Sequence, residues 1–372
     1  GIKGHESPQE EESNEESLHI LYFCLSLKRS NLMNMMRPVQ RTLFFVGAMA
    51  LLLCGCSHDP LDVDISGIDL DMKLERFDRD LFEMEQDTMD HAIGALYSQY
   101  GDFFDVFNVH VISIGQASSR RYSSYLSMFI NDPTNREVYD YSRQVFANTE
   151  EIESALTRGF KHYLYHYPDS LSPRVVAYVS RFNQGLFTVG NFVGVGLDQY
   201  LGSDCPYYQQ MGTPQYLVRK KEPSRVAVDV MYAWATQLYP YNDSLDNVLS
   251  RMIYHGQLAW FVGAMYPDLG EQMNLGFTDD QMKWCLNNEE QMWTHLVEEK
   301  LLFSTDPMNI RKLVEDAPYT RFYTSESPGR AAVWQGMQIV KAFAGRNPKL
   351  AVHQVMSQRN YQEMLRLSRY NP

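Results

Sequence analysis

Residues 174–180 read RVVAYVS and residues 187–195 read FTVGNFVGV, and these two stretches decide the fold that the sequence predicts. The first is rich in β-branched residues and alternates, as a strand does, and the second is a weaker strand interrupted by glycine. Pro168 and Pro173 close the helical segment before them and lead into the first strand. Val106–Ile114 (VFNVHVISI) alternates in the same way, so we expect a strand there too.

Most of the remaining sequence has helical periodicity. Leu74, Phe77, Leu81 and Phe82 recur at spacings of three and four residues, which is typical of an amphipathic helix. The other helices are predicted at 87–100, 122–130, 135–146, 150–167, 214–219, 224–238, 244–265, 278–287, 289–301, 329–343 and 348–367. Thr278-Asp279-Asp280-Gln281 is a capping box, and Asn347-Pro348 predicts an N-cap followed by proline at the first helical position. The fold class is therefore α+β and predominantly helical, with a small sheet in the first half of a single domain.

The N-terminal region carries the signature of a bacterial lipoprotein signal. Basic residues Arg37 and Arg41 precede an apolar run, and the run ends in Leu53-Cys54-Gly55-Cys56, which fits a lipobox with Cys56 as the lipid acceptor. The run is too short for a membrane span, which needs about 20 apolar residues.

The same signal sets the expected organisation of the chain. Residues 1–32 are expected to be an upstream segment outside the fold, because Met33, Met35 and Met36 are each candidate starts just before the basic region. Residues 33–55 are then the signal peptide, 56–71 a polar tether and 72–372 one domain. The lipid on Cys56 would anchor that domain in the cell envelope, at the inner or outer membrane of a Gram-negative bacterium.

The amino-acid composition limits the kinds of partner and ligand that the protein is expected to bind. The formal net charge is −13, and the densest basic run is Arg219-Lys220-Lys221, which we interpret as a solvated helix end. Nucleic-acid binding is not expected, because it depends on neutralising many phosphates with Lys and Arg. Cys205 and Cys285 could form one disulfide or remain free buried thiols, and the absence of a CxxC pair argues against a thiolate metal site.

The sequence contains no complete catalytic motif of the common hydrolases. Neither GxSxG nor HExxH occurs in the sequence. His162 and His166 have the helical spacing to share a metal, but Tyr163 stands where the general base of a zincin would be. We therefore interpret both histidines as surface or groove residues on an aromatic-rich helix.

Three further positions are unusual for their predicted elements. Gly256 beside His255 interrupts a long helix at a cost of about 1 kcal/mol, which favours a tight helix crossing. Asp229 lies on an otherwise apolar helix, and Arg225 one turn earlier is its expected ion-pair partner. The glycine-rich stretch 193–202 lacks GxGxxG and the P-loop lysine, so a strand entering a tight turn explains it better than a phosphate site.

Several blocks in the same order resemble the gliding motility-associated lipoprotein GldB family. They are Arg76–Phe82, Val195–Gly202, Arg251–Gly256, Asn288–Trp293, Ser327–Val340 and Leu365–Pro372. The residues that carry the family motifs are Asp198, Tyr200, Gly202, His255, Gly256, Pro328, Gly329, Arg330 and Trp334.

The resemblance implies a zincin-like fold related to metallopeptidases whose metal site has been lost. In active relatives one helix bears HExxH and the next donates an acidic ligand near a glycine, and we place these helices at 224–238 and 244–265. The first has no histidine, and the second has His255 where a glutamate is expected. No catalytic residue, metal or other cofactor is therefore assigned.

The leading hypothesis is a non-enzymatic envelope lipoprotein that acts by contacts with motility, secretion or other envelope proteins. One alternative is a metal-dependent hydrolase with an atypical site, for which His162, His166, Asp198, Asp229 and His255 are the candidate ligands. Another is a lipoprotein that binds a ligand in a groove lined by aromatic side chains.

Overall fold

The computed structural model describes residues 61–372 except 243 and 245, and these residues lie in one compact unit. The predicted upstream segment, the signal peptide and Cys56 lie outside the described residues. No helix in the described part of the chain is long and apolar enough to cross a membrane.

A four-stranded sheet occupies the first half of the unit, in the order β1-β2-β4-β3. Its strands are β1 (Leu74–Glu75), β2 (Arg174–Tyr178), β3 (Leu186–Val189) and β4 (Phe192–Gly196). β1 and β4 are parallel to β2, whereas β3 is antiparallel to β4. The expected strand at 174–180 is confirmed, and the one at 187–195 is a β3–β4 hairpin that turns at Gly190, where φ is +54°.

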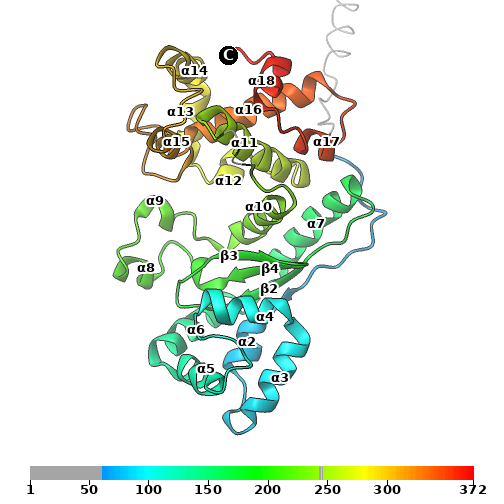
Figure 1. Ribbon diagram of the computed structural model, residues 1–372, viewed down its shortest axis with the longest axis vertical. Coiled ribbons are helices and arrows are strands. Elements are labelled where there is room, and N and C mark those ends of the chain that lie inside the picture. The colour runs from blue at the N-terminus through cyan, green and yellow to red at the C-terminus, as the bar shows by residue number, and fades with distance from the viewer. Residues whose placement is uncertain (1–60, 243, 245) are drawn as a thin grey trace, which may run out of the picture. The chain divides into compact units, whose positions relative to one another are not determined.

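Helices cover both faces of this sheet (Figure 1). Those that precede β2 are α2 (Phe77–Phe82), α3 (Met89–Tyr100), α4 (Asp102–Val106), α5 (Tyr122–Asn131), α6 (Pro133–Val145) and α7 (Glu150–His166). α2 contacts β2 and α4 contacts β3 on one face, while α10 contacts β3 and β4 on the other. The predicted α+β class with a small sheet in the first half is therefore confirmed.

The second half of the unit is helical, as expected. Its helices are α8 (Pro206–Gln210), α9 (Gln215–Val218), α10 (Val226–Leu238), α11 (Val248–Met265), α12 (Glu271–Leu275), α13 (Asp279–Asn287), α14 (Glu289–Glu298), α15 (Pro307–Val314), α16 (Ala331–Arg346), α17 (Val352–Met356) and α18 (Tyr361–Ser368). α11 is buried almost along its whole length and contacts α7, α10, α12 and α15–α18. It is the central helix of this half.

The prediction of a strand at Val106–Ile114 is wrong. The segment continues α4 into a π-helical stretch, η2 (Phe107–Val111). Phe103, Phe107 and Val111 are buried at four-residue spacing, so they form one helical face that begins before the apparent alternation. Phe107 packs edge-on against Phe77 at a centroid distance of 4.9 Å, and this aromatic core favours the helix over the strand.

The predicted long helix at 348–367 is also wrong. Asn347 lies at the C-terminal end of α16, where its side chain donates to the carbonyl of Phe343, and does not cap a following helix. The chain then forms two short helices, α17 and α18, and the side chain of Asn360 caps the second by accepting from the amide of Glu363. Cys205 and Cys285 are both free and buried.

Candidate functional site

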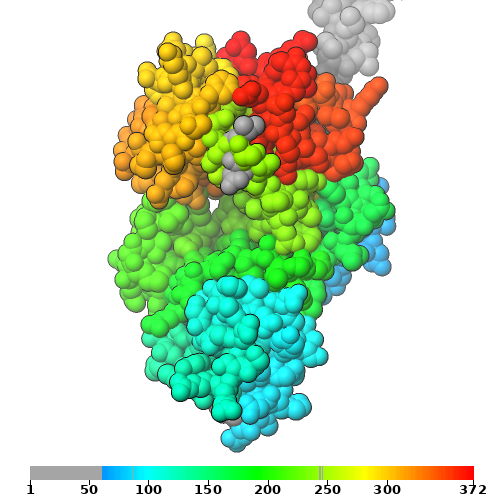
Figure 2. Space-filling view, viewed as in Figure 1, coloured from blue at the N-terminus to red at the C-terminus, as the bar shows by residue number. Residues whose placement is uncertain are grey.

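The candidate site lies where the segment before α10 meets the N-terminal end of α16. Five charged side chains gather there: Lys220, Arg225, Asp229, Asp316 and Arg330, which we call the ion cluster. They line a cavity of about 180 Å³ together with Tyr232 and Asn274. Figure 2 shows that the surface is hollowed between the green segment, which leads into α10, and the yellow and orange segments that follow α11.

One half of the ion cluster is a pair within the first turn of α10. Arg225 Nη2 donates to Asp229 Oδ1 at 2.6 Å, and the hydroxyl of Tyr200 donates to Asp229 Oδ2 at 3.1 Å. Arg225 Nη1 also donates to the carbonyl of Met273. The predicted ion pair between Arg225 and Asp229 is therefore confirmed, and a family-motif tyrosine completes it.

The other half joins two loops that are distant in sequence, the one that follows α9 and the one between α15 and α16. Lys220 Nζ donates to Asp316 Oδ1 at 2.5 Å, and Arg330 Nε lies 3.9 Å from the same oxygen. Arg330 caps α16 with a left-handed backbone, at φ +52° and ψ +35°. A residue other than glycine pays about 1 kcal/mol for this conformation, and such strain is concentrated at functional sites.

Burial and crowding of cations shift the pKa values of the ion cluster. The pKa of Lys220 falls to about 8 because the side chain is buried and because Arg330 and Arg225 lie close to it. Burial would raise the pKa of Asp316, but the charges of Arg330 and Lys220 hold it below its ordinary value. Asp316 is therefore ionised at neutral pH, and Lys220 is mostly protonated.

Interpreting Arg219-Lys220-Lys221 as a solvated helix end is wrong for its last two residues. The side chain of Lys220 is only 18% exposed, and Lys221 Nζ donates to Gln199 Oε1. Gly276, with φ +68°, leaves room for the stem of Lys220, since a Cβ at Gly276 would lie 3.2 Å from Lys220 Cε. The basic run that precedes the apolar helix α10 therefore contributes Lys220 to the candidate site.

His255 of α11 is next to this site and is held by a tyrosine. Tyr232 Oη and His255 Nδ1 are 2.9 Å apart. Burial, with Arg330 and Arg251 nearby, lowers the pKa of His255 to about 4, so the imidazole is neutral at pH 7. The expected tight crossing beside it is confirmed, because a Cβ on Gly256 would lie 2.3 Å from the carbonyl carbon of Gly336.

The remaining candidate ligands have separate surroundings. Asp198 Oδ2 accepts from the amides of Ser180 and Phe182 at 3.0 and 2.5 Å, and so holds a turn in which Arg181 and Phe182 both have positive φ. Stretch 193–202 is, as expected, a strand that enters a tight turn. His162 and His166 lie on α7, and the interpretation of both as surface or groove residues is wrong for His162, which is only 4% exposed.

Within the described residues, no group of three or more His, Cys, Asp or Glu side chains is placed to hold a metal ion. The five candidate ligands named from the sequence therefore do not form one site. Two of them, Asp229 and His255, are brought together with Tyr200 and Arg330, because α10, α11 and the start of α16 meet there.

The other family-motif residues shape this region. Gly202 has φ +89°, and its amide donates to the carbonyl of Lys221, which fixes the loop that carries Lys220. Gly329 lies against the backbone of Ala317, and the carbonyl of Pro328 accepts from the hydroxyl of Thr320. Trp334 is fully buried, and its indole N–H donates to Glu271. These contacts hold Asp316 and Arg330 next to each other.

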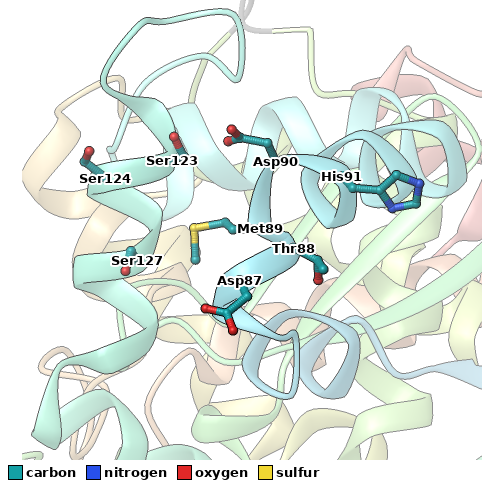
Figure 3. Close-up of a pocket in the computed structure, with 8 residues that line it drawn as sticks. All are labelled: Asp87, Thr88, Met89, Asp90, His91, Ser123, Ser124 and Ser127. Carbon is teal, nitrogen blue, oxygen red and sulfur yellow. The ribbon is translucent and has the colours of Figure 1, made fainter.

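A larger hollow lies elsewhere, between α3 and α5. It has a volume of about 720 Å³ and is lined by Asp87 and Asp90 on one side and by serines of α5 on the other. Figure 3 shows that His91 points away from it. None of its lining residues has a buried side-chain polar atom without a partner among the described residues, so nothing in it indicates a ligand.

Comparison with protein-family models places the chain in a known family. The model of the family described as gliding motility protein GldB matches residues 58–372, which includes the whole described unit. No curated protein and no solved structure matches. The zincin likeness therefore stays a prediction.

Proposed function

The chain belongs to the gliding motility protein GldB family, and on that premise we propose that it is a non-enzymatic lipoprotein of the cell envelope. It would be anchored through a lipid on Cys56 and act by contacts with motility, secretion or other envelope proteins. The observation that carries the proposal is the extent of the family match, which spans the ion cluster and every helix of the described unit.

The contacts of α10 and α11 support a role without catalysis. A zincin would need histidines on the first of these helices and an acidic ligand on the second. Instead, Asp229 is held by Arg225 and Tyr200, and His255 is held by Tyr232. With these partners, neither side chain is arranged as the histidine and acidic ligands of a zincin are.

Two experiments test the proposal in the native host. Deletion of the gene is expected to reduce surface motility, protein secretion or envelope integrity, and complementation with the unaltered gene restores the phenotype. Complementation with Cys56→Ala should move the protein from the membrane to the soluble fraction and abolish the rescue, while Cys205→Ala, a change in a buried free thiol, should leave the protein at the membrane.

Three results would overturn the proposal. A deletion strain without any change in motility, secretion or envelope integrity would contradict the family role. Full rescue by soluble Cys56→Ala would contradict the need for the anchor. Stoichiometric zinc in the purified protein, measured by atomic emission, together with zinc-dependent peptide hydrolysis, would favour the metal-dependent hydrolase instead.

A further inference from the structure

The ion cluster has more positive than negative charge at its cavity. Three cations, Lys220, Arg225 and Arg330, face two carboxylates, Asp229 and Asp316. Arg225 pairs with Asp229 and Lys220 pairs with Asp316, at 2.6 and 2.5 Å. Among the residues that the structure describes, Arg330 has no carboxylate of its own, and its charge contact with Asp316 is at 3.9 Å.

Two guanidinium groups at the cavity have N–H donors to spare. The side chain of Arg330 is 20% exposed, and its buried Nε has no hydrogen-bond partner among the described residues. The same holds for Nε of Arg225, a residue that is only 8% exposed. Buried donors without an acceptor are costly and rare in folded proteins, so these two N–H groups favour a ligand that can accept hydrogen bonds.

The cavity also offers an unused acceptor. Asn274 lines it and is 6% exposed, and its Nδ2 donates to the carbonyl of Ala259. Its Oδ1 is buried without a donor among the described residues. A ligand that carries an N–H or O–H next to a negative group would match both kinds of unpaired atom.

We propose that this cavity binds the carboxylate of a small ligand, with Arg330 as its main partner and Lys220 and Arg225 as supporting cations. A single negative charge balances the excess of one positive charge, and the planar guanidinium matches the two oxygens of a carboxylate. At about 180 Å³ the cavity is smaller than a typical drug-sized pocket, so it holds the acidic group and little more. The group can belong to a free short acid or to the end of a peptide chain.

The electrostatics of the residues that line the cavity support the same conclusion. Burial lowers the pKa of Lys220, and the neighbouring cations Arg330 and Arg225 lower it further, whereas Asp316 raises it only in part. An anion at the cavity would stabilise all three cations at once. It would also explain why Arg330 is kept in a strained left-handed conformation at the start of α16. This inference does not depend on the proposed role in motility.

The test measures equilibrium binding to the full chain, purified in detergent, by titration calorimetry at constant ionic strength with chloride as the balancing anion. The probes are acetate, trialanine, trialanine amide and inorganic phosphate. Binding of acetate without trialanine identifies a free acid as the ligand class, and binding of trialanine but not of its amide identifies a chain end. Both results support a carboxylate site.

Variants with opposite expected effects make the test specific. Arg330→Gln should weaken carboxylate binding about tenfold, which corresponds to about 1.4 kcal/mol. Asp316→Asn should strengthen binding, because it adds one unit of net positive charge and frees Lys220 and Arg330, and an unfolded variant cannot show a gain. Arg311→Gln is the matched control, because this arginine on α15 is 69% exposed and pairs with Glu315 outside the cavity.

Four results would overturn the proposal. They are failure of both acetate and trialanine to bind the unaltered chain, equal binding by Arg330→Gln, weaker binding by Asp316→Asn, and tighter binding of phosphate than of either carboxylate. If Arg330→Gln does not fold, Lys220→Gln replaces it with the same expected direction.

Discussion

Gly256 of α11 and Gly336 of α16 meet backbone to backbone. A Cβ on Gly256 would lie 2.3 Å from the carbonyl carbon of Gly336, and a Cβ on Gly336 would lie 1.9 Å from the carbonyl oxygen of Met252. Neither neighbour is a flexible side chain, so an added methyl group must push the two helices apart. α11 is central to the second half of the unit, and the crossing therefore fixes the position of α16 and of Arg330 at its start.

We expect Gly256→Ala to lower the free energy of unfolding by about 1–3 kcal/mol, measured by urea denaturation. Overpacking at the crossing outweighs the gain in helix propensity, which is about 1 kcal/mol. Gly94→Ala is the control, because Gly94 lies on α3 with nothing within 4 Å of an added Cβ, and this change should stabilise by about 0.5–1 kcal/mol. Equal effects of the two changes would contradict the close crossing.

The Arg225–Asp229 pair should be far more sensitive than an exposed pair of the same spacing. Asp229→Ala leaves the buried guanidinium of Arg225 without its carboxylate, so we expect a loss of about 3 kcal/mol in the free energy of unfolding. Glu315→Ala breaks the Arg311–Glu315 pair, also spaced by four residues but 69% and 57% exposed, and should cost less than about 0.5 kcal/mol. Similar losses in the two variants would show that Arg225 is not buried as described.

The lowered pKa of His255 predicts that the protein loses stability in mild acid. The pKa of His255 is about 4 in the folded protein and 6.5 for a histidine in the unfolded chain. Between pH 4 and 6.5 the unfolded chain therefore binds the proton and the folded chain does not. Stability should therefore fall as pH drops from about 6.5 to 4, by up to roughly 3 kcal/mol. His255→Asn keeps a polar group for Tyr232 and should reduce this fall, measured by urea denaturation at a series of pH values. A variant with an unchanged pH profile would exclude His255 as the cause.

The raised pKa of Asp198 predicts the opposite dependence of stability on pH, over a similar pH range. Burial raises its pKa to about 6, although the amides of Phe182 and Ser180 favour the ionised form, so the folded state binds its proton more tightly than the unfolded state. This contribution makes the protein less stable as pH rises from about 4 to 6. Asp198→Asn removes the titration but keeps an oxygen that can accept from both amides.

The measurement is the difference in unfolding free energy between Asp198→Asn and the unaltered chain at pH 4 and at pH 7. Relative to the unaltered chain, the variant should gain stability as the pH rises. Asp198→Ala serves as the contrast, because it leaves both amides without their acceptor and should destabilise at every pH. A constant difference between Asp198→Asn and the unaltered chain would contradict the raised pKa.

Local signals allowed much of the fold to be predicted from sequence. The capping box at Thr278–Gln281 is formed, and it starts α13 at Asp279 as expected. Pro168 and Pro173 correctly separate α7 from β2. The prediction of a strand at Val106–Ile114 is wrong because it considers only the alternation within these nine residues. Phe103 and Phe104, just before them, begin a helical spacing of buried residues, and packing in the aromatic core stabilises that helix.

The site was only partly predictable, for a different reason. Asp229 with Arg225 could be found because both lie one turn apart on one helix. Lys220 lies in the loop before α10, whereas Asp316 and Arg330 lie at the two ends of the loop between α15 and α16, and no spacing rule connects the three residues. Asp306 before Pro307 and Asn360 before Glu363 are caps that the sequence does contain, and they would have identified α15 and the start of α18.

The two-residue strand β1 forms one edge of the sheet and follows directly on the first described residues. Tension on the segment before Met72 would first load the contacts of Leu61 and Leu70 with the hydrophobic core and then reach this edge of the sheet. It is borne there by the bidentate pair of Arg174 with Glu75 at 2.7 and 2.6 Å, and by the hydrogen bond from the amide of Met72 to Thr157 Oγ1 at 2.9 Å. Because β1 is short and lies at the edge, a pull that reached it would separate β1 from β2 while β2, β4 and β3 stay paired.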